Sequence, residues 1–297
     1  MIFSDSVSPT APTTELSASL TSAATPTAPI APPTAPIAPQ TTPIAPTAPT
    51  NRSPTSYKKW GSTVASPEEA YWFDPRIHNF GNTGLSGAFH AAIAPFATKL
   101  IDRLAYDSRD IRDEISAFLA DGAFMTKREG ERKILDIGCG VGMSTRALKK
   151  HFKDADVLGL DTSPEMLRVA KLRARIQGNE AGGTGTLSYL RGNGERTLFP
   201  DSTFDVVTIM YAFHECPKLG RYKVLREARR LLKKGGRLAV VDISPCYEPS
   251  KQMLSGEPYV LEFQKNFLSQ LKMTGLEEEL YRVVIPKHVA MWVMRRT

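Results

Sequence analysis

The feature that most constrains the fold is a glycine-rich turn between a short apolar segment and a helix-forming segment. Residues 133–137 (Lys-Ile-Leu-Asp-Ile) are an apolar run that predicts a buried strand, and residues 143–151 have helical character. Between them lie Gly138, Gly140 and Gly142. Glycine lets the backbone turn sharply and approach a ligand closely, and the helix that follows presents free N–H groups. The turn predicts a ligand site at the end of a strand.

Strand-like and helix-like segments alternate along the remaining chain. We expect strands at 133–137, 156–160, 187–190, 204–210, 237–243, 278–285 and 288–295, and helices at 143–151, 164–177, 218–233 and 257–273. Alternation of this kind predicts an α/β fold with a doubly wound, mostly parallel, seven-stranded Rossmann-like sheet. Ligands of such sheets bind beyond the carboxyl ends of the strands, so residues that follow the strands are the first candidates for a site.

The chain divides into three parts by composition. Of its 22 prolines, 12 fall between Pro9 and Pro54, and the sequence Pro-Ile-Ala-Pro recurs three times there. Because proline cannot continue a helix, residues 1–56 are predicted to be a disordered tail rich in Ala, Pro and Thr. Residues 57–130 are predicted to form an N-terminal helical cap, with helices at 88–104, interrupted near Pro95, and at 109–124. Residues 131–297 are predicted to form the ligand-binding domain.

Charge and cysteine content exclude several classes of protein. The formal net charge is +7, and the tail contributes only Asp5, Glu15 and Arg52, so the rest of the chain carries +8. No run of 18 apolar residues predicts a transmembrane helix. Three widely spaced cysteines match neither a disulfide framework nor a zinc-ligand pattern, and we expect no metal. A cytoplasmic location is predicted, and a plastid or mitochondrial address stays open if the tail is a transit segment.

Three further motifs follow the predicted strands. Asp161 ends the second strand, where carboxylates bind ribose hydroxyls in nucleoside-binding folds; its alternative role is to cap the next helix. Asn193-Gly194 lies within Gly-Asn-Gly-Glu after the third strand, and Leu-Phe-Pro-Asp-Ser-Thr-Phe-Asp at 198–205 precedes the fourth. A dinucleotide site would need its third glycine one position later, where Met143 stands.

Together these motifs closely resemble the class I S-adenosylmethionine (SAM)-dependent methyltransferases. The resemblance covers residues 133–243 well, and it is closest to the ubiquinone/menaquinone-biosynthesis group, also called methyltransferase type 11. The segment 82–90 is similar to the entry helix of that group, whereas 253–259 departs from it.

The resemblance implies that the cofactor is SAM, with the glycine turn along its methionine part, Asp136 on its ammonium group, Asp161 on its ribose and Asn193 on its adenine. The implied cofactor-binding residues are Asp136, Gly138, Cys139, Gly140, Gly142, Asp161, Thr162, Asn193, Gly194, Met210 and Tyr211.

Two segments are candidates for the acceptor side. His214 follows the fourth strand and can act as a general base near neutral pH, with Glu215 as an orienting neighbour; its alternative role is packing. The aromatic segment 71–82 is expected to fold over the acceptor. The candidate substrate-binding residues are Tyr71, Trp72, Arg76, His78 and His90.

The predicted function is therefore SAM-dependent methyl transfer to a small-molecule acceptor. Basic residues at 168–175 and 226–234 keep a nucleic-acid methyltransferase open as an alternative, although such clusters are more often solvated helix faces. A SAM-binding protein without catalysis, docked through its tail, is the second alternative. The acceptor atom and the oligomeric state are not apparent from the sequence.

Overall fold

The structure is a computed structural model that describes residues 71–74, 77, 80–121, 131–178 and 182–297. The predicted tail at 1–56 therefore lies outside the described residues. The elements are η2 (Tyr71–Phe73), α1 (Gly84–Ala105), α2 (Ile111–Ala120), β1 (Lys133–Ile137), α3 (Met143–His151), β2 (Asp156–Asp161), α4 (Pro164–Gln177), β3 (Leu187–Arg191), β4 (Phe204–Met210), η4 (Phe213–Glu215), α5 (Lys218–Leu231), β5 (Leu232–Ile243), α6 (Lys251–Gly256), α7 (Val260–Lys272), β6 (Glu277–Ile285) and β7 (Val289–Arg295).

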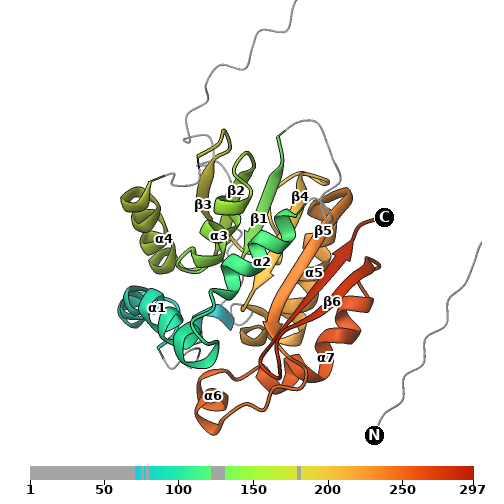
Figure 1. The fold of residues 1–297 in the computed structure, drawn as a ribbon. Helices are drawn as coiled ribbons and strands as arrows, with labels where there is room; N and C mark the ends of the chain where they lie inside the picture. The colour runs from blue at the N-terminus through green and yellow to red at the C-terminus, as the bar shows by residue number, and fades with distance from the viewer. Residues whose placement is uncertain (1–70, 75–76, 78–79, 122–130, 179–181) are drawn as a thin grey trace, which may run out of the picture. The chain divides into compact units, whose positions relative to one another are not determined.

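Seven strands form one sheet in the order β3-β2-β1-β4-β5-β7-β6 (Figure 1). The first five strands in this order are parallel, and β7 is antiparallel to both β5 and β6. The predicted doubly wound, mostly parallel sheet is therefore confirmed. The strand order reverses at β1, so β1, β2 and β4 end side by side, which is where a ligand of such a sheet binds.

Helices cover both faces of the sheet and bury two apolar clusters. On one face, α2 and α3 pack Ile115 and Leu148 against strand residues such as Val206. On the other face, α5 and α7 pack Leu225 and Phe267 against the sheet. In Figure 1, α2 crosses in front of the sheet beside β1 and β4, while α1 lies beyond one end of the strands. Because α1 covers no face of the sheet, its side chains are available at the carboxyl ends of the strands.

Most predicted strands and central helices match the observed ones closely, and the exceptions have physical causes. β5 begins at Leu232 and not at residue 237, because the backbones of Gly235 and Gly236 exchange hydrogen bonds with Arg296. The break near Pro95 is wrong: α1 continues through this buried proline. Proline removes one helical hydrogen bond, and α1 here buries Ala91 in a cluster with Met166 of α4, which stabilises the helix across the gap. The helix expected at 257–273 begins at Val260, and α6 precedes it as a separate turn of helix with Ser250 as its N-cap.

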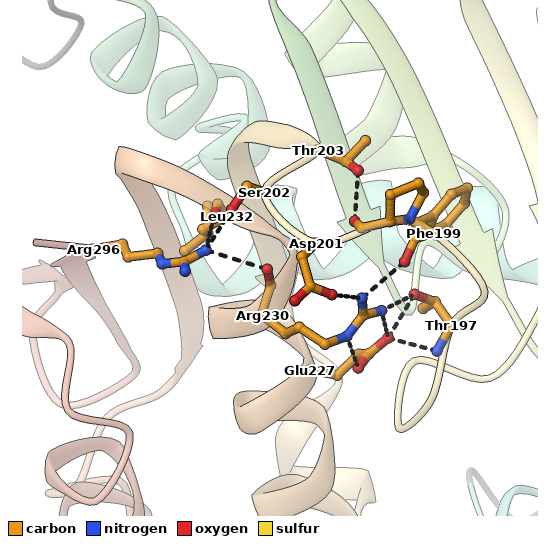
Figure 2. Close-up of polar contacts among 10 residues, drawn as sticks. Thr197, Phe199, Asp201, Ser202, Thr203, Glu227, Arg230, Leu232 and Arg296 are labelled. Atoms are coloured by element: carbon orange, nitrogen blue, oxygen red, sulfur yellow. Dashed lines mark hydrogen bonds and ion pairs between the residues drawn. The ribbon is translucent and has the colours of Figure 1, made fainter.

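An arginine cluster fixes the loop that leads from the site into β4 (Figure 2). Arg230 of α5 donates to both carboxylate oxygens of Glu227, at 2.9 and 2.7 Å, and to the Phe199 carbonyl at 2.9 Å. Its Nη1 also lies 2.5 Å from a carboxylate oxygen of Asp201. Glu227 in turn accepts from the backbone and hydroxyl of Thr197 at 2.7 and 2.6 Å. The loop at 197–201 is thereby held against α5, although it forms no strand or helix.

Candidate functional site

A cavity of about 360 Å³ lies at the carboxyl ends of β1, β2 and β4. Its wall combines the turn after β1, the ends of β2 and β3, the segment after β4, and residues of η2, α1 and α2. Its volume falls in the range of small-molecule sites, about 300–1,000 Å³. The cavity therefore lies where the sheet topology places a ligand, and segments from both the predicted cap and the predicted ligand-binding domain contribute to it.

The glycine turn forms one wall of the cavity. Gly138 and Gly140 both line it and have φ values of +72° and +50°, which favour glycine. A Cβ at Gly138 would lie 2.8 Å from the Cβ of Ala212, so this position cannot hold a larger residue without movement. A Cβ at Gly140 would meet no atom of the described residues within 4 Å. The backbone at Gly140 thus faces open space where a ligand can approach it.

Asp161 lies at the end of β2 and lines the same cavity. Its carboxylate accepts hydrogen bonds of 2.8 Å from the backbone N–H groups of Gly140 and Ser163. Burial raises the pKa of the Asp161 carboxyl to about 6, although both N–H groups lower it. Helix capping, the alternative role for Asp161, belongs to Ser163, whose hydroxyl accepts from the backbone N–H of Met166. Asp161 therefore remains available to bind ligand hydroxyls.

Two residues predicted to bind the cofactor do not line the cavity. Asp136 is fully buried behind the turn, and its carboxylate accepts from the hydroxyls of Ser144, Thr145 and Thr208 at 2.6–2.8 Å. Ser144 does line the cavity and so lies between Asp136 and the space. Gly142 caps α3 with φ +78°, and a Cβ there would lie 2.5 Å from the Tyr189 hydroxyl. The structure therefore brings Asp136 near the site without exposing it to the cavity.

The other residues predicted to bind the cofactor line the cavity, as a set drawn from four strand ends: Cys139, Thr162, Asn193, Gly194, Met210 and Tyr211. Asn193 uses its side-chain oxygen to accept from the backbone N–H of Glu195 at 2.8 Å. This bond leaves a second lone pair on the same oxygen for a ligand donor. The cavity thus offers a carboxylate that can accept from hydroxyl groups (Asp161), an amide side chain (Asn193) and an open glycine backbone (Gly140). These groups suit a polar nucleoside, and they suit SAM.

His214 lies in η4 after β4, lines the cavity and is 7% exposed. Its Nδ1 lies 2.6 Å from a carboxylate oxygen of Asp242. Burial alone would lower the pKa of His214, but the charge and hydrogen bond of Asp242 raise it to about 9. Asp242 also accepts from the backbone N–H groups of Phe213 and Ile243, at 2.9 and 2.7 Å, which fix its orientation. The group that orients His214 in the structure is therefore Asp242.

Sequence reasoning missed Asp242 and expected Glu215 beside His214. The signal was present, because Asp242 is an acid near the carboxyl end of β5 and directly follows the apolar run 238–241. Glu215 lines the cavity as well, and its carboxylate, that of Glu257 and a ring nitrogen of His214 have ligand atoms within 4.8 Å of one another. Spacing in the sequence gives no sign of this group, since Glu257 comes from the segment between α6 and α7.

On the acceptor side, the structure brings Tyr71, Trp72 and His90 to the cavity wall. His90 Nδ1 lies 3.3 Å from the Gly81 carbonyl, and Tyr71 packs edge-on against Trp72 with ring centroids 5.2 Å apart. The other two predicted substrate residues, Arg76 and His78, lie outside the described residues. The aromatic segment therefore contributes two of its rings to the cavity wall, and its contact with an acceptor stays a prediction.

Charged residues of the cap also line the cavity, and the sequence analysis did not single them out. Asp102 of α1 and Arg112 of α2 lie on the wall together with Tyr106 and Tyr211. Both charged residues stand on helical segments, where a single acid or base in the sequence is typical of a solvated face. No periodicity separates an inward-facing charge of this kind from an outward-facing one, so only the fold identifies them.

The basic residues behind the nucleic-acid alternative are partly neutralised. In the second group, Arg230 pairs with Glu227 and Lys233 pairs with Asp205 at 2.7 Å. Arg168 of the first group points to solvent with 74% of its side chain exposed. Such contacts are typical of charged side chains that face solvent on a helix or that hold a loop in place. Within the described segments, no helix has the length and apolar character needed to cross a membrane.

Comparison with known proteins relates this geometry to a family. The family described as "Methyltransferase domain" matches residues 135–240. The demethylmenaquinone methyltransferase of Thermotoga maritima is 29% identical over 169 residues, covering 55% of this chain and 67% of the relative. The ubiquinone/menaquinone biosynthesis C-methyltransferase of Yersinia pestis is 34% identical over 124 residues, covering 41% of this chain and 47% of the relative. The chain thus spans between about half and two thirds of these relatives.

Among solved structures, the PH0226 protein of Pyrococcus horikoshii has a similar fold, with a TM-score of 0.51 and 20% sequence identity. The similarity covers 69% of this chain and 98% of that protein. At this identity the likeness concerns the fold alone.

Proposed function

The chain belongs to the class I SAM-dependent methyltransferases, and from this premise we propose that it transfers the methyl group of SAM to a small-molecule acceptor. One observation carries the proposal: a single cavity joins the glycine turn and Asp161 to the aromatic residues of η2, to α1 and to His214. Its volume of about 360 Å³ suits small molecules, whereas a nucleic-acid substrate would require an open basic groove.

SAM, when bound, supplies a methyl group attached to a sulfonium sulfur. The sulfur is the leaving group and becomes a neutral thioether. The residues of the chain position both partners. Asp161 would accept hydrogen bonds from the ribose hydroxyls, and Asn193 would accept one from the adenine amino group. The backbone at Gly140 would border the methionine part. In-line transfer needs the acceptor atom about 3 Å from the methyl carbon, and holding it there provides much of the acceleration.

His214 is the group that takes the acceptor's proton in this proposal. A new bond forms between the acceptor atom and the methyl carbon, the carbon–sulfur bond breaks with its electron pair going to sulfur, and the acceptor's proton passes to His214. Asp242 holds Nδ1, so Nε2 is the nitrogen that receives the proton. Because the pKa of His214 is about 9 in the free protein, a role as base predicts activity that rises with pH up to about 9.

The proposal also assigns a role to each of the three predicted parts of the chain. Residues 131–297 would bind SAM, and residues 57–130 would supply the acceptor wall. The tail at 1–56 would be dispensable for SAM binding. Deletion of the tail should leave SAM affinity unchanged. Deletion through residue 130 would also remove α2, which packs Ile115 against the sheet, so the acceptor wall is tested by Trp72→Ala, which should lower acceptor methylation while the fold is kept.

The first experiment is calorimetric titration with SAM, followed by transfer from methyl-labelled SAM to a panel of quinols, phenols, amines, thiols and an RNA. Quinols are the first acceptors to try because the named relatives concern menaquinone and ubiquinone. Asp161→Asn should weaken SAM binding strongly, while Glu278→Gln removes an exposed carboxylate of β6 and should not. Absence of SAM binding by the wild type refutes the proposal, and labelled RNA would support the nucleic-acid alternative.

A further inference from the structure

One side of α1 is exposed and almost entirely apolar. Five large apolar side chains on it are between 55 and 93% exposed: Leu85, Phe89, Phe96, Leu100 and Leu104. Their spacing of four, seven, four and four residues puts them on one stripe of the helix. The helix has 22 residues and is about 33 Å long, so the stripe runs along nearly its whole length. We call this stripe the α1 face.

The other sides of α1 have partners within the fold. His90, Thr98 and Asp102 line the cavity, and Ala91 packs with Met166 of α4. Only three of the 22 residues of α1 are charged, and a helix with so few charges is typically covered on every side. Contiguous apolar side chains that remain exposed usually mark an interaction surface. The α1 face therefore has the composition of a contact surface, and the charges around it indicate what it contacts.

The exposed charges of α1 itself are positive. Lys99 and Arg103 are exposed and lie four residues apart beside the stripe, whereas Asp102, the one acid of the helix, is buried. The next exposed acids along the chain, Asp107 and Asp110, come after α1 has ended. A long basic side chain at the edge of an apolar stripe can lay its methylene groups on the apolar surface and keep its charge outside. The α1 face is thus an apolar stripe with a basic edge.

Helix α4, which neighbours α1 (Figure 1), adds to this charge. Arg168, Lys171 and Arg175 are exposed on α4, and its one acid, Glu165, lies 3.8 Å from Arg168. Together the two helices contain six basic residues and two acids, a net charge of +4. This is more than half of the net charge of +7 of the whole chain. The partner of the α1 face should therefore be both apolar and negatively charged.

An anionic lipid bilayer meets both conditions, because negative headgroups lie directly above an apolar interior. A second copy of the chain, docked face to face, would bring Lys99 and Arg103 against like charges. The tail at 1–56 contains only two acids, Asp5 and Glu15, so it supplies little complementary charge. The phosphate backbone of a nucleic acid supplies charge but leaves the leucine side chains of the stripe in water.

We propose that α1 is an interfacial helix that docks this chain on the surface of an anionic lipid bilayer. The α1 face lies about 5–10 Å deep, at the boundary between headgroups and acyl chains. Lys99 and Arg103 contact the headgroups at the edge of the stripe. The basic residues of α4 add attraction that weakens as the salt concentration rises. Docking requires neither SAM nor an acceptor, so it is independent of the proposed function.

The test measures flotation of the full chain with unilamellar vesicles of two compositions. One is phosphatidylcholine alone, and the other contains about one third phosphatidylserine. We expect at least about tenfold stronger binding to the anionic vesicles, because each basic residue near the surface contributes about fivefold. The preference should shrink when salt is raised from about 0.05 M to about 0.5 M. Absence of binding to the anionic vesicles, or equal binding to both compositions, overturns the inference.

A first pair of variants tests the apolar stripe. The double change Phe96→Ser, Leu104→Ser removes two exposed apolar side chains that do not line the cavity. Binding to the anionic vesicles should fall at least about tenfold. The control Leu219→Ser, Leu261→Ser changes side chains that are 61% and 57% exposed on α5 and α7, and it should bind as the wild type does. Undiminished binding by the stripe variant overturns the inference, because a charged surface alone would then suffice.

A second pair tests the basic edge. The double change Lys99→Gln, Arg103→Gln should weaken binding to the anionic vesicles at least about tenfold. Lys265→Gln, Lys272→Gln removes the same charge from exposed positions of α7 and should have a much smaller effect. Equal effects of the two pairs overturn the inference, because net charge and not the α1 face would then determine binding.

S-adenosylhomocysteine binding and thermal unfolding are measured for every variant and should match the wild type, because the changed residues are exposed. Sedimentation velocity tests the second copy as occupant: a dimer that dissociates in the stripe variant overturns the inference. A wild type that binds anionic vesicles but not S-adenosylhomocysteine supports the docking and counts against the proposed function. A wild type that binds S-adenosylhomocysteine but not the vesicles counts against the docking alone.

Discussion

The buried pair of His214 and Asp242 predicts a pH dependence of stability that can be calculated. The pKa of His214 is about 9 in the folded chain and 6.5 for an unperturbed histidine, a difference of about 2.5 units. Since one unit corresponds to 1.36 kcal/mol, the protonated imidazole contributes about 3 kcal/mol to the free energy of unfolding. The folded pKa is raised, so this contribution is complete below pH 6.5 and is lost as pH rises toward 9.

The assay is urea unfolding of the ligand-free protein between pH 6 and 9.5, with His214→Gln measured in parallel. Groups that do not contact His214 titrate alike in both proteins, so the difference between them reports on the pair of His214 and Asp242. We expect wild type to lose about 3 kcal/mol relative to the variant across this range. Asp242→Asn supplies a second check: with that negative charge removed, only Glu215 and Glu257 oppose the effect of burial, so the pKa of His214 should fall and the loss of stability toward pH 9 should shrink.

Histidine NMR signals make the same prediction directly. The chain has five histidines, and the signal missing from His214→Gln identifies His214. Its titration midpoint should lie near 9 in wild type. A midpoint at or below 6.5, or a stability difference that stays constant from pH 6 to 9.5, would refute the argument that Asp242 holds His214 protonated. It would also remove the reason to expect activity to rise toward pH 9.

Three other predictions concern the cofactor side and the loop anchor. The pKa of Asp161 is about 6, and ribose hydroxyls bind its ionised form, so SAM affinity measured by calorimetry should fall as pH drops below 6 and should lose this dependence in Asp161→Asn. Gly138→Ala places a Cβ 2.8 Å from a neighbouring side chain at φ +72°, and SAM should bind at least about tenfold weaker in the same assay. Arg230→Met leaves the buried Glu227 without its cation and should lower the free energy of unfolding by about 2 kcal/mol in urea titrations, whereas Arg226→Met, at an exposed position of the same helix, should not.

Much of the fold was predictable because the core strands are recognisable from their local amino-acid pattern. β1 and β4 are mostly apolar segments bounded by polar or glycine residues, and their predicted bounds match the observed ones. The capped start of α4 was predictable for the same reason, since Ser163 followed by Pro164 is a local signature of a helix N-terminus. The continuity of α1 through Pro95 was not, because it depends on packing against α4 that no local pattern encodes.

The cofactor side was likewise more predictable than the chemistry next to it. Gly138, Gly140 and Asp161 follow strands directly, so the rule that ligands bind at strand ends finds them without knowledge of side-chain packing. His214 was also found by this rule, but its partner was not. Asp242 lies on the neighbouring strand β5, 28 residues away, and adjacency across a parallel sheet becomes visible only once the strand order is known.

The residues on the acceptor side depend both on packing between distant segments and on the order of the strands, so sequence similarity is a weak guide to the substrate. The family match begins at residue 135, whereas Asp102 and Arg112 lie before it. A relative that shares the matched domain can therefore share the cofactor site while differing in the side chains that meet the acceptor. For this chain the names of the relatives bear on the methyl donor more strongly than on the acceptor. The acceptor is better sought from the wall itself, where Asp102 and Arg112 lie together with Tyr106 and Tyr211.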